Sequence, residues 1–196
     1  MKLDIYKRLH AVDRLLERTT DKRHRTIVNN FLRHATLEVC GLWEGILIPE
    51  MTVEHPVYRF HTPEGFTLYD GMDAVRRMYI GFVEEGSTVM YHTDAHVAVT
   101  DEGMFFEYVN NRYFKGAALL RQGIDVDDPK ADYMSSHTNA MFWPYDERCR
   151  MIGEHVYRGN DRKIRRLDPS EVITQEDCRT HLLPRAPRLE DCYLPG

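Results

Sequence analysis

The chain has 196 residues, of which 42% are hydrophobic and 29% charged, with a formal net charge of −5 and a pI near 6.1. This acidic balance argues against a nucleic-acid-binding protein, whose basic surface would dominate. The length fits one domain with a sizeable core. No apolar run approaches the roughly 20 residues of a membrane span, and the first residues lack the apolar segment of a signal peptide.

The first half of the chain is predicted to be mainly helical. Apolar residues at helical spacing indicate a helix over 3–18, a second over 26–35 and a shorter third from Leu37 to Leu47, which Pro49 ends. A short strand at 51–55 follows, then a loop over 56–70. A glycine turn at Gly71 opens a further helix over 72–85, which Gly86 closes.

From residue 88 the pattern changes to the period of two that is typical of strands. Segments 88–100 and 104–116 form one predicted hairpin, and 131–143 and 149–158 form another. The fold class is therefore α+β, with helices on one face of a curved sheet. The other face is not polar enough for plain exposure to solvent, so we expect a homodimer through it. We divide the chain into an N-terminal helix, 1–20, a main domain, 21–166, and a C-terminal extension, 167–196.

The four cysteines form no C-x-x-C pair, so the sequence gives no sign of a zinc or redox motif. They are Cys40, Cys149, Cys178 and Cys192. We expect free thiols in a cytoplasmic protein, where the environment is reducing.

Five short segments, taken in order and spacing, resemble one known superfamily. They are Phe31-Leu32, 42–47 (LWEGIL), 52–56 (TVEHP), 71–75 (GMDAV) and 153–157 (GEHVY). Residues 24–158 are similar to the SnoaL-like group of the nuclear transport factor 2-like superfamily, which includes ketosteroid isomerase, scytalone dehydratase and polyketide cyclases. The resemblance implies a cone-shaped, curved antiparallel sheet with the N-terminal helices on its concave face. It does not by itself imply one reaction, because such folds host many.

The resemblance to ketosteroid isomerase implies a changed set of catalytic residues. That family uses an Asp base, a tyrosine and a protonated carboxyl. The corresponding positions here fall on His55, near Phe31 and near Asn139. A histidine still accepts protons near neutral pH, but the phenol is lost and an amide donates without titrating. We therefore do not expect steroid isomerisation.

The resemblance to the dehydratases and cyclases implies other candidate acids and bases. A dehydratase-like histidine base lies on the first long strand, about eleven residues before the glycine of the next turn, and His92 and Gly103 fit that spacing. In those relatives an early Asp orients the histidine, but this chain has no Asp between positions 21 and 70, so Glu38, Glu44 or Asp94 would have to substitute. In cyclase-like relatives a polar residue of the last strand acts, and His155 or Glu154 lies there.

Alternation along the strands predicts which polar residues share a sheet face. Asp94 and His96 should share the face of His92, and His137 and Asn139 should share theirs with His155 if the second hairpin closes in register. The catalytic candidates are therefore His55, His92, Asn139 and His155. The candidates for substrate binding are Trp43, Tyr58, Phe60, Tyr91, Asp94, Glu107, Arg112 and His137.

Ordinary structural roles stay open for several of these residues. His55 would also serve as a strand-end histidine bonded to backbone, Trp43 as core, and Arg112 as one half of a surface ion pair. A metal site of His92, His96 and His137 is not expected, because residues four apart on a strand lie about 13 Å apart.

These observations predict a cofactor-independent enzyme of the dehydratase or cyclase type. A histidine base would act on a hydrophobic or aromatic, ketone-bearing small molecule. The partners would be that molecule and a second copy of the chain, with no nucleic acid, membrane, metal or cofactor. The alternative is a non-catalytic ligand-binding protein, or a structural subunit such as the small subunit of ring-hydroxylating dioxygenases, which shares this fold.

Overall fold

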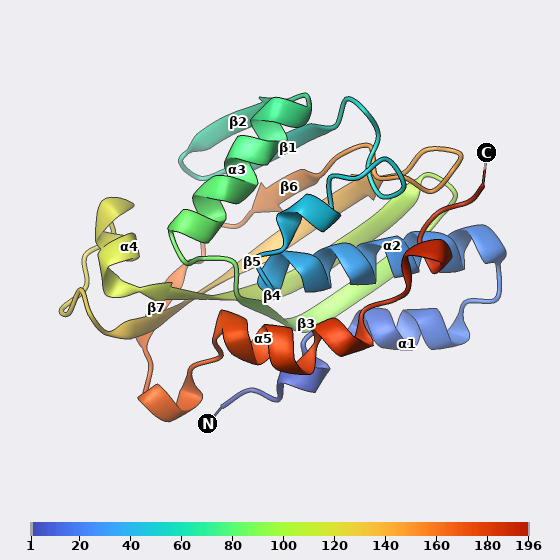
Figure 1. Cartoon of the computed structure of the whole chain (residues 1–196). Coiled ribbons are helices and arrows are strands. Elements are labelled where there is room, and N and C mark those ends of the chain that lie inside the picture. The colour runs from blue at the N-terminus through green and yellow to red at the C-terminus, as the bar shows by residue number, and fades with distance from the viewer. Residues whose placement is uncertain (1, 196) are drawn as a thin grey trace.

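A computed structural model describes residues 2–195 as an α+β fold, with helices covering the concave face of one curved sheet (Figure 1). The sheet order is β2-β1-β6-β5-β4-β3, and β7 pairs with β5 beyond the end of β6. Only β1 and β6 run parallel among the described strands; every other pair is antiparallel. The strands are β1 (Val57–Thr62), β2 (Gly65–Asp70), β3 (Met90–Val99), β4 (Gly103–Lys115), β5 (Asp132–Pro144), β6 (His155–Arg158) and β7 (Lys163–Arg166).

The longest helix, α2 (Lys22–Val39), lies across β3 and β4, and α1 (His10–Arg18) lies beside it (Figure 1). The α3 helix (Met72–Glu84) covers β1 and β2. The remaining helices are α4 (Gly116–Arg121), α5 (Gln175–His181) and the 3-10 turns η1 (Ile5–Lys7), η2 (Trp43–Gly45), η3 (Pro169–Glu171), η4 (Leu183–Arg185) and η5 (Leu189–Asp191).

Several predicted elements are confirmed. The helix over 72–85 is α3, and Gly86 beyond its end takes a positive φ of 65°, as a C-terminal cap requires. Both predicted hairpins exist as β3–β4 and β5–β6. The predicted first helix is present in two pieces, η1 and α1, with Arg8 and Leu9 between them.

Other predicted elements are wrong. The helix expected over 37–47 is the end of α2 followed by a turn, because Gly41 with a φ of 67° reverses the chain. The strand expected at 51–55 is a single bridge from Thr52 to Met151, and the true strand β1 begins after Pro56. The expected loop over 56–70 is the β1–β2 hairpin. Apolar and polar residues alternate along β1, but β2 buries no residue that would mark a strand face, since its apolar Phe66 and Leu68 are exposed.

The main core lies between α2 and the sheet. The ring of Phe31 on α2 packs against Phe106 of β4 at 4.5 Å between centroids, and against Trp143 of β5 at 4.8 Å. A second cluster joins Val39 at the end of α2 to Val89, Leu167 and Ile173. Leu167 and Ile173 of the C-terminal extension therefore pack on the body of the chain.

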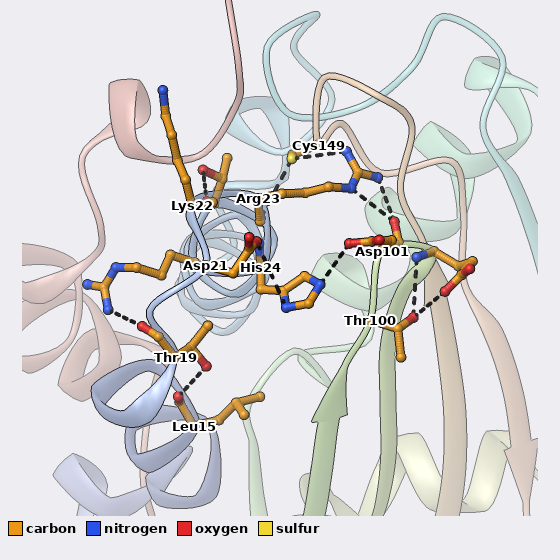
Figure 2. Close-up of polar contacts among 12 residues, drawn as sticks. Leu15, Thr19, Asp21, Lys22, Arg23, His24, Thr100, Asp101 and Cys149 are labelled. Atoms are coloured by element: carbon orange, nitrogen blue, oxygen red, sulfur yellow. Dashed lines mark hydrogen bonds and ion pairs between the residues drawn. The ribbon is translucent and has the colours of Figure 1, made fainter.

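The start of α2 is joined to both hairpin turns by Arg23 (Figure 2). Its guanidinium donates to the carbonyl oxygens of Asp101, in the β3–β4 turn, and of Asp146 and Glu147, after β5. His24 Nε2 lies 2.9 Å from Asp101 Oδ1. These contacts fix one end of α2 over the sheet and so set the depth of the space beneath it.

We expect Arg23→Met to lower the free energy of unfolding by about 2 kcal/mol, because three carbonyl oxygens lose a charged donor. Lys22→Met is the matched control, since the neighbouring Lys22 side chain is exposed and makes no hydrogen bond within residues 2–195. The control should change stability by less than about 0.5 kcal/mol. Urea unfolding of the three proteins measures the difference. Equal midpoints for wild type and Arg23→Met would contradict the role of Arg23.

Candidate functional site

A cavity of about 250 Å³ lies between the helices and the concave face of the sheet. Its apolar wall includes Phe31 from α2, Phe82 from α3, Phe106 from β4 and Trp143 from β5. Polar side chains also line it, and they form three groups: a carboxyl network, a histidine–tyrosine pair and two arginines. A mostly apolar pocket with a few convergent polar groups is the usual form of a small-molecule site.

The carboxyl network centres on Glu154, which lies just before β6 and is only 6% exposed. The Tyr79 hydroxyl, from α3, donates to Glu154 Oε1 at 3.4 Å and lies 2.7 Å from His34 Nε2 on α2. His34 Nε2 is itself 3.5 Å from Glu154 Oε1. The Tyr58 hydroxyl lies 3.2 Å from that of Tyr79 and extends the network behind the cavity wall.

Burial sets the protonation states in this network. It raises the pKa of Glu154 well above the usual carboxyl range, and the charge of nearby Glu38 raises that pKa further. Burial also lowers the pKa of His34 to about 3. Glu154 is therefore a protonated, O–H-bearing acid over a pH range in which His34 is neutral.

Gly153 allows this placement of Glu154. A Cβ at position 153 would overlap the Val57 carbonyl of the neighbouring strand β1. The backbone of β1 can therefore approach only a glycine this closely, and that approach sets the chain leading into β6.

The histidine–tyrosine pair lies on β3 and β4. The rings of His92 and Tyr108 are 4.0 Å apart, and Nε2 of His92 is buried with no hydrogen-bond partner within residues 2–195. Burial, aided by the charge of Arg8, lowers the pKa of His92 to about 3. Asn139 Nδ2 donates to the Tyr108 hydroxyl at 3.2 Å, and the hydroxyl proton faces the Met141 sulfur, a weak acceptor. The pair thus presents a free proton acceptor and a weakly engaged donor.

The two arginines are Arg8, between η1 and α1, and Arg112 on β4. Arg8 Nη2 donates to the Ala35 carbonyl at 2.8 Å, and Arg112 Nε donates to the Ser87 carbonyl. Glu38 is the acid whose charge acts on both, and burial raises its own pKa against their influence. Neither arginine forms an ion pair within the part of the chain that the structure describes.

The structure brings five of the sequence-predicted site residues to this cavity. They are Phe60, His92, Arg112, His137 and Asn139. Tyr58 lies directly behind its wall and reaches it through Tyr79. The surface ion pair considered for Arg112 is absent from the described residues, and its side chain instead packs 4.4 Å from the Phe82 ring.

The other predicted residues lie elsewhere. The His55 side chain is 71% exposed and pairs with Asp70 at 2.8 Å, outside the cavity. Trp43 packs at the edge of the main core, and Tyr91 lies in the second cluster. Asp94 lines a separate groove beside α1, while Glu107 and His155 line a shallow groove on the outer face of the sheet.

Register and a bulge explain the misplacement of two histidines. His155 pairs with Phe142, so it points to the face opposite His137 and Asn139, and its neighbour Glu154 points inward. On β3 the register shifts between Thr93 and His96, where Asp94 has a φ of 50°. This bulge reverses the alternation, so His96 pairs with Glu107 on the outer face.

Sequence reasoning missed several cavity residues. They are Arg8, Tyr79, Tyr108 and Trp143 in the lining, and His34, which lies behind it and bonds to Tyr79. For His34 a signal existed: it lies between Asn30 and Glu38 at steps of four, a polar stripe on one side of the amphipathic helix α2. No comparable signal marked Tyr79, which reads as an ordinary core residue of an amphipathic helix.

Within residues 2–195, no three His, Cys, Asp or Glu side chains are grouped so that they could hold a metal ion. None of the helices in this range combines the length and the apolar character needed to cross a membrane.

Comparison with known proteins places the fold but not the activity. No protein-family model matches the chain, and no curated protein sequence matches it. Among solved structures, an NTF2-like protein from Anabaena variabilis superposes with a TM-score of 0.53 at 15% identity, covering 74% of this chain and 96% of that one. The chain therefore has the fold of the nuclear transport factor 2-like superfamily.

Two other solved structures resemble the chain more loosely. The epoxide hydrolase/cyclase-like enzyme SalBIII, which acts in pyran ring formation in the polyether salinomycin, has a TM-score of 0.47 at 13% identity, covering 72% of this chain and 95% of that one. The phenazine biosynthesis-related protein PhzB2 from Pseudomonas aeruginosa has a TM-score of 0.44 at 10% identity, covering 76% and 84%.

The lowered pKa of His34 predicts a specific pH dependence of stability. In the unfolded state this histidine takes up a proton below about pH 6.5. In the folded state it stays neutral until the pH approaches its pKa of about 3. The contribution of neutral His34 to the free energy of unfolding is therefore fully present above about pH 6.5 and is lost as the pH falls. Between pH 7 and 5 the loss is about 2 kcal/mol.

We expect His34→Gln to be less stable than wild type at pH 7 but to lose about 2 kcal/mol less on acidification to pH 5. The exposed His10→Gln variant is the control and should follow the wild type. Chemical unfolding at both pH values measures these losses. The buried carboxyls change the free energy of unfolding with pH in the opposite direction, and this contribution cancels when the proteins are compared. Parallel losses in wild type and His34→Gln would contradict a neutral, buried His34.

Proposed function

We propose that this chain is a cofactor-independent enzyme that removes a proton from a carbon next to a carbonyl group of a mostly apolar small molecule. The observation that carries the proposal is the pairing of His92 and Glu154 in one cavity. One offers an unpartnered imidazole nitrogen, and the other a buried carboxyl whose pKa is raised. Enzymes that run acid and base chemistry together use groups whose environments separate their pKa values in this way.

In this proposal Nε2 of His92 takes the proton from carbon. The negative charge that develops on the carbonyl oxygen is stabilised by the Tyr108 hydroxyl, which Asn139 holds in place at 3.2 Å. In a dehydration, Glu154 gives its proton to the departing hydroxyl group, which leaves as water. His92 then carries the added proton and Glu154 has lost one, so a proton passed between them restores the enzyme.

Dehydration and cyclisation share this first step, and the cavity supports either. The Tyr79 and His34 contacts keep Glu154 in place and limit its rotamers. The alternative is a non-catalytic protein that keeps the pocket for binding alone.

Replacing His92 tests the base directly. In deuterium oxide the enzyme should accelerate exchange at the acidic carbon of a cyclic aromatic ketone such as α-tetralone. His92→Gln should lower this acceleration by about 100-fold, the usual contribution of a general base. Proton NMR measures the exchange. His55→Gln is the matched control, because His55 lies outside the cavity, and its rate should stay within about twofold of wild type.

The same assay has a distinctive pH dependence. Because the pKa of His92 is about 3, the base form persists well below pH 6.5, so exchange should hold between pH 7 and 5. A rate that falls with a midpoint at 6.5, or an unchanged rate in His92→Gln, would contradict His92 as the base. No acceleration by wild type over several ketones would favour the binding protein.

We also propose that the chain forms a homodimer through the outer face of the sheet. Phe105 and Tyr157 are 44% and 51% exposed there, and Phe105 stacks on Phe142 at 4.5 Å. The groove beside them is largely apolar, as expected for the centre of an interface. A cytoplasmic location is supported by the four free, buried cysteines.

A charge at the centre of this face should separate the subunits. We expect Tyr157→Glu to sediment as a monomer while wild type sediments as a dimer, since desolvating an unpaired carboxylate costs several kcal/mol. Leu120→Glu is the control, because Leu120 is also exposed but lies on α4. Analytical ultracentrifugation measures the mass, and a dimeric Tyr157→Glu variant would rule out this face.

A further inference from the structure

The two cavity arginines are not explained by the proposed proton transfer. Arg8 is only 4% exposed, and its Nη1 has no hydrogen-bond partner in residues 2–195. Nη2 of Arg112 is also buried and unpartnered in that range. Both side chains line the cavity. Each guanidinium therefore carries one nitrogen whose hydrogens are shielded from solvent and unused, which is costly for a charged group.

Other contacts hold each guanidinium in place. Arg8 is tied to α2 through the Ala35 carbonyl, and Arg112 is tied to the Ser87 carbonyl and packs over the Phe82 ring. Fixed donors of this kind bind an anion with little loss of side-chain freedom. The arrangement differs from a pair of flexible surface arginines.

The charge balance of the cavity is positive. Arg8 and Arg112 share the cavity with two acids, Glu38 and Glu85. The third acid of the lining, Glu154, stays neutral because its pKa is raised. Arg158 and Arg162 also line the cavity, and both pair with Glu64, so together they leave one net positive charge. Burial lowers the pKa of both Arg8 and Arg112, which reflects a desolvation cost that an anion would offset.

We propose that the ligand of this cavity carries a carboxylate, which binds between Arg8 and Arg112 while its apolar body lies against Phe31, Phe106 and Trp143. Two oxygens of one carboxylate match the buried, unpartnered nitrogen on each guanidinium. A phosphate group has more oxygens and a higher charge than these two buried nitrogens satisfy. If the chain is the enzyme proposed above, its substrate is an apolar keto acid. Carboxylate binding itself does not depend on that function.

Binding of small aromatic acids tests the inference without any turnover. The probes are benzoate, naphthoate and biphenyl carboxylate, each compared with its neutral amide of the same shape. Trp143 lines the cavity, so its fluorescence reports binding once the other tryptophan is removed by Trp43→Phe. Calorimetry provides a second reading, and inorganic phosphate is titrated in parallel.

We expect at least one acid to bind about tenfold or more tightly than its amide. Arg112→Gln should lower the affinity for that acid by about tenfold and leave the affinity for its amide within about twofold of wild type. Arg8→Gln should do the same. Arg112→Lys and Arg8→Lys keep the charge but lose the planar fork, and they cover the case in which a Gln variant does not fold. Arg76→Gln, which breaks an exposed ion pair on α3, is the control and should change nothing.

Three results would overturn the proposal. They are acids that bind no better than their amides, arginine variants that weaken acid and amide equally, and phosphate that displaces the acids at lower concentration than they bind. The ketone exchange assay separates this failure from failure of the function. If acids bind no better than amides but wild type still accelerates ketone exchange, only the carboxylate site is ruled out. If acids bind better but no exchange is seen, the chain is a carboxylate-binding protein without this chemistry.

Discussion

The cavity depends on a polar stripe along the buried helix α2. Asn30, His34 and Glu38 follow one another at steps of four residues, so they lie on one side of the helix. Nδ2 of Asn30 lies 3.1 Å from the carbonyl oxygens of Met51, Cys149 and Cys192, which ties the helix to two loops and the C-terminal segment. Because Asn30 and His34 are buried, each must find a polar partner, and the partners of these two residues hold α2 in its place above the sheet.

The same constraint links stability to chemistry. His34 stays neutral because it is buried, and it can be buried because Tyr79 and Glu154 bond to its Nε2 side. Glu154 in turn keeps its proton because the site excludes water. Burying the Glu154 carboxyl in its protonated form costs folding stability at a pH where the unfolded chain would ionise it.

The cavity lining combines neutral polar groups with charged groups, and this combination would orient a ligand. The carboxyl network and the His92–Tyr108 pair supply neutral donors and acceptors, whereas Arg8 and Arg112 supply unpaired positive charge. A ligand with one anionic group and one carbonyl group would bind in a single orientation. Fixing a ligand in this way makes proton transfer effective, because the reacting atoms are held within reach.

The sequence by itself determined the α+β class, helix α3 and both central hairpins, because strong periodicity and glycine turns are local signals. It also named His92, His137, Asn139 and Arg112 as candidates, and these four residues line the cavity. Only the tertiary structure decided that Glu154 and not His155 faces the cavity, because one residue of register reverses a strand's faces. It also decided that His55 is exposed and that Arg8, His34 and Tyr79 meet the strands, since contacts between residues far apart in the chain leave no local pattern.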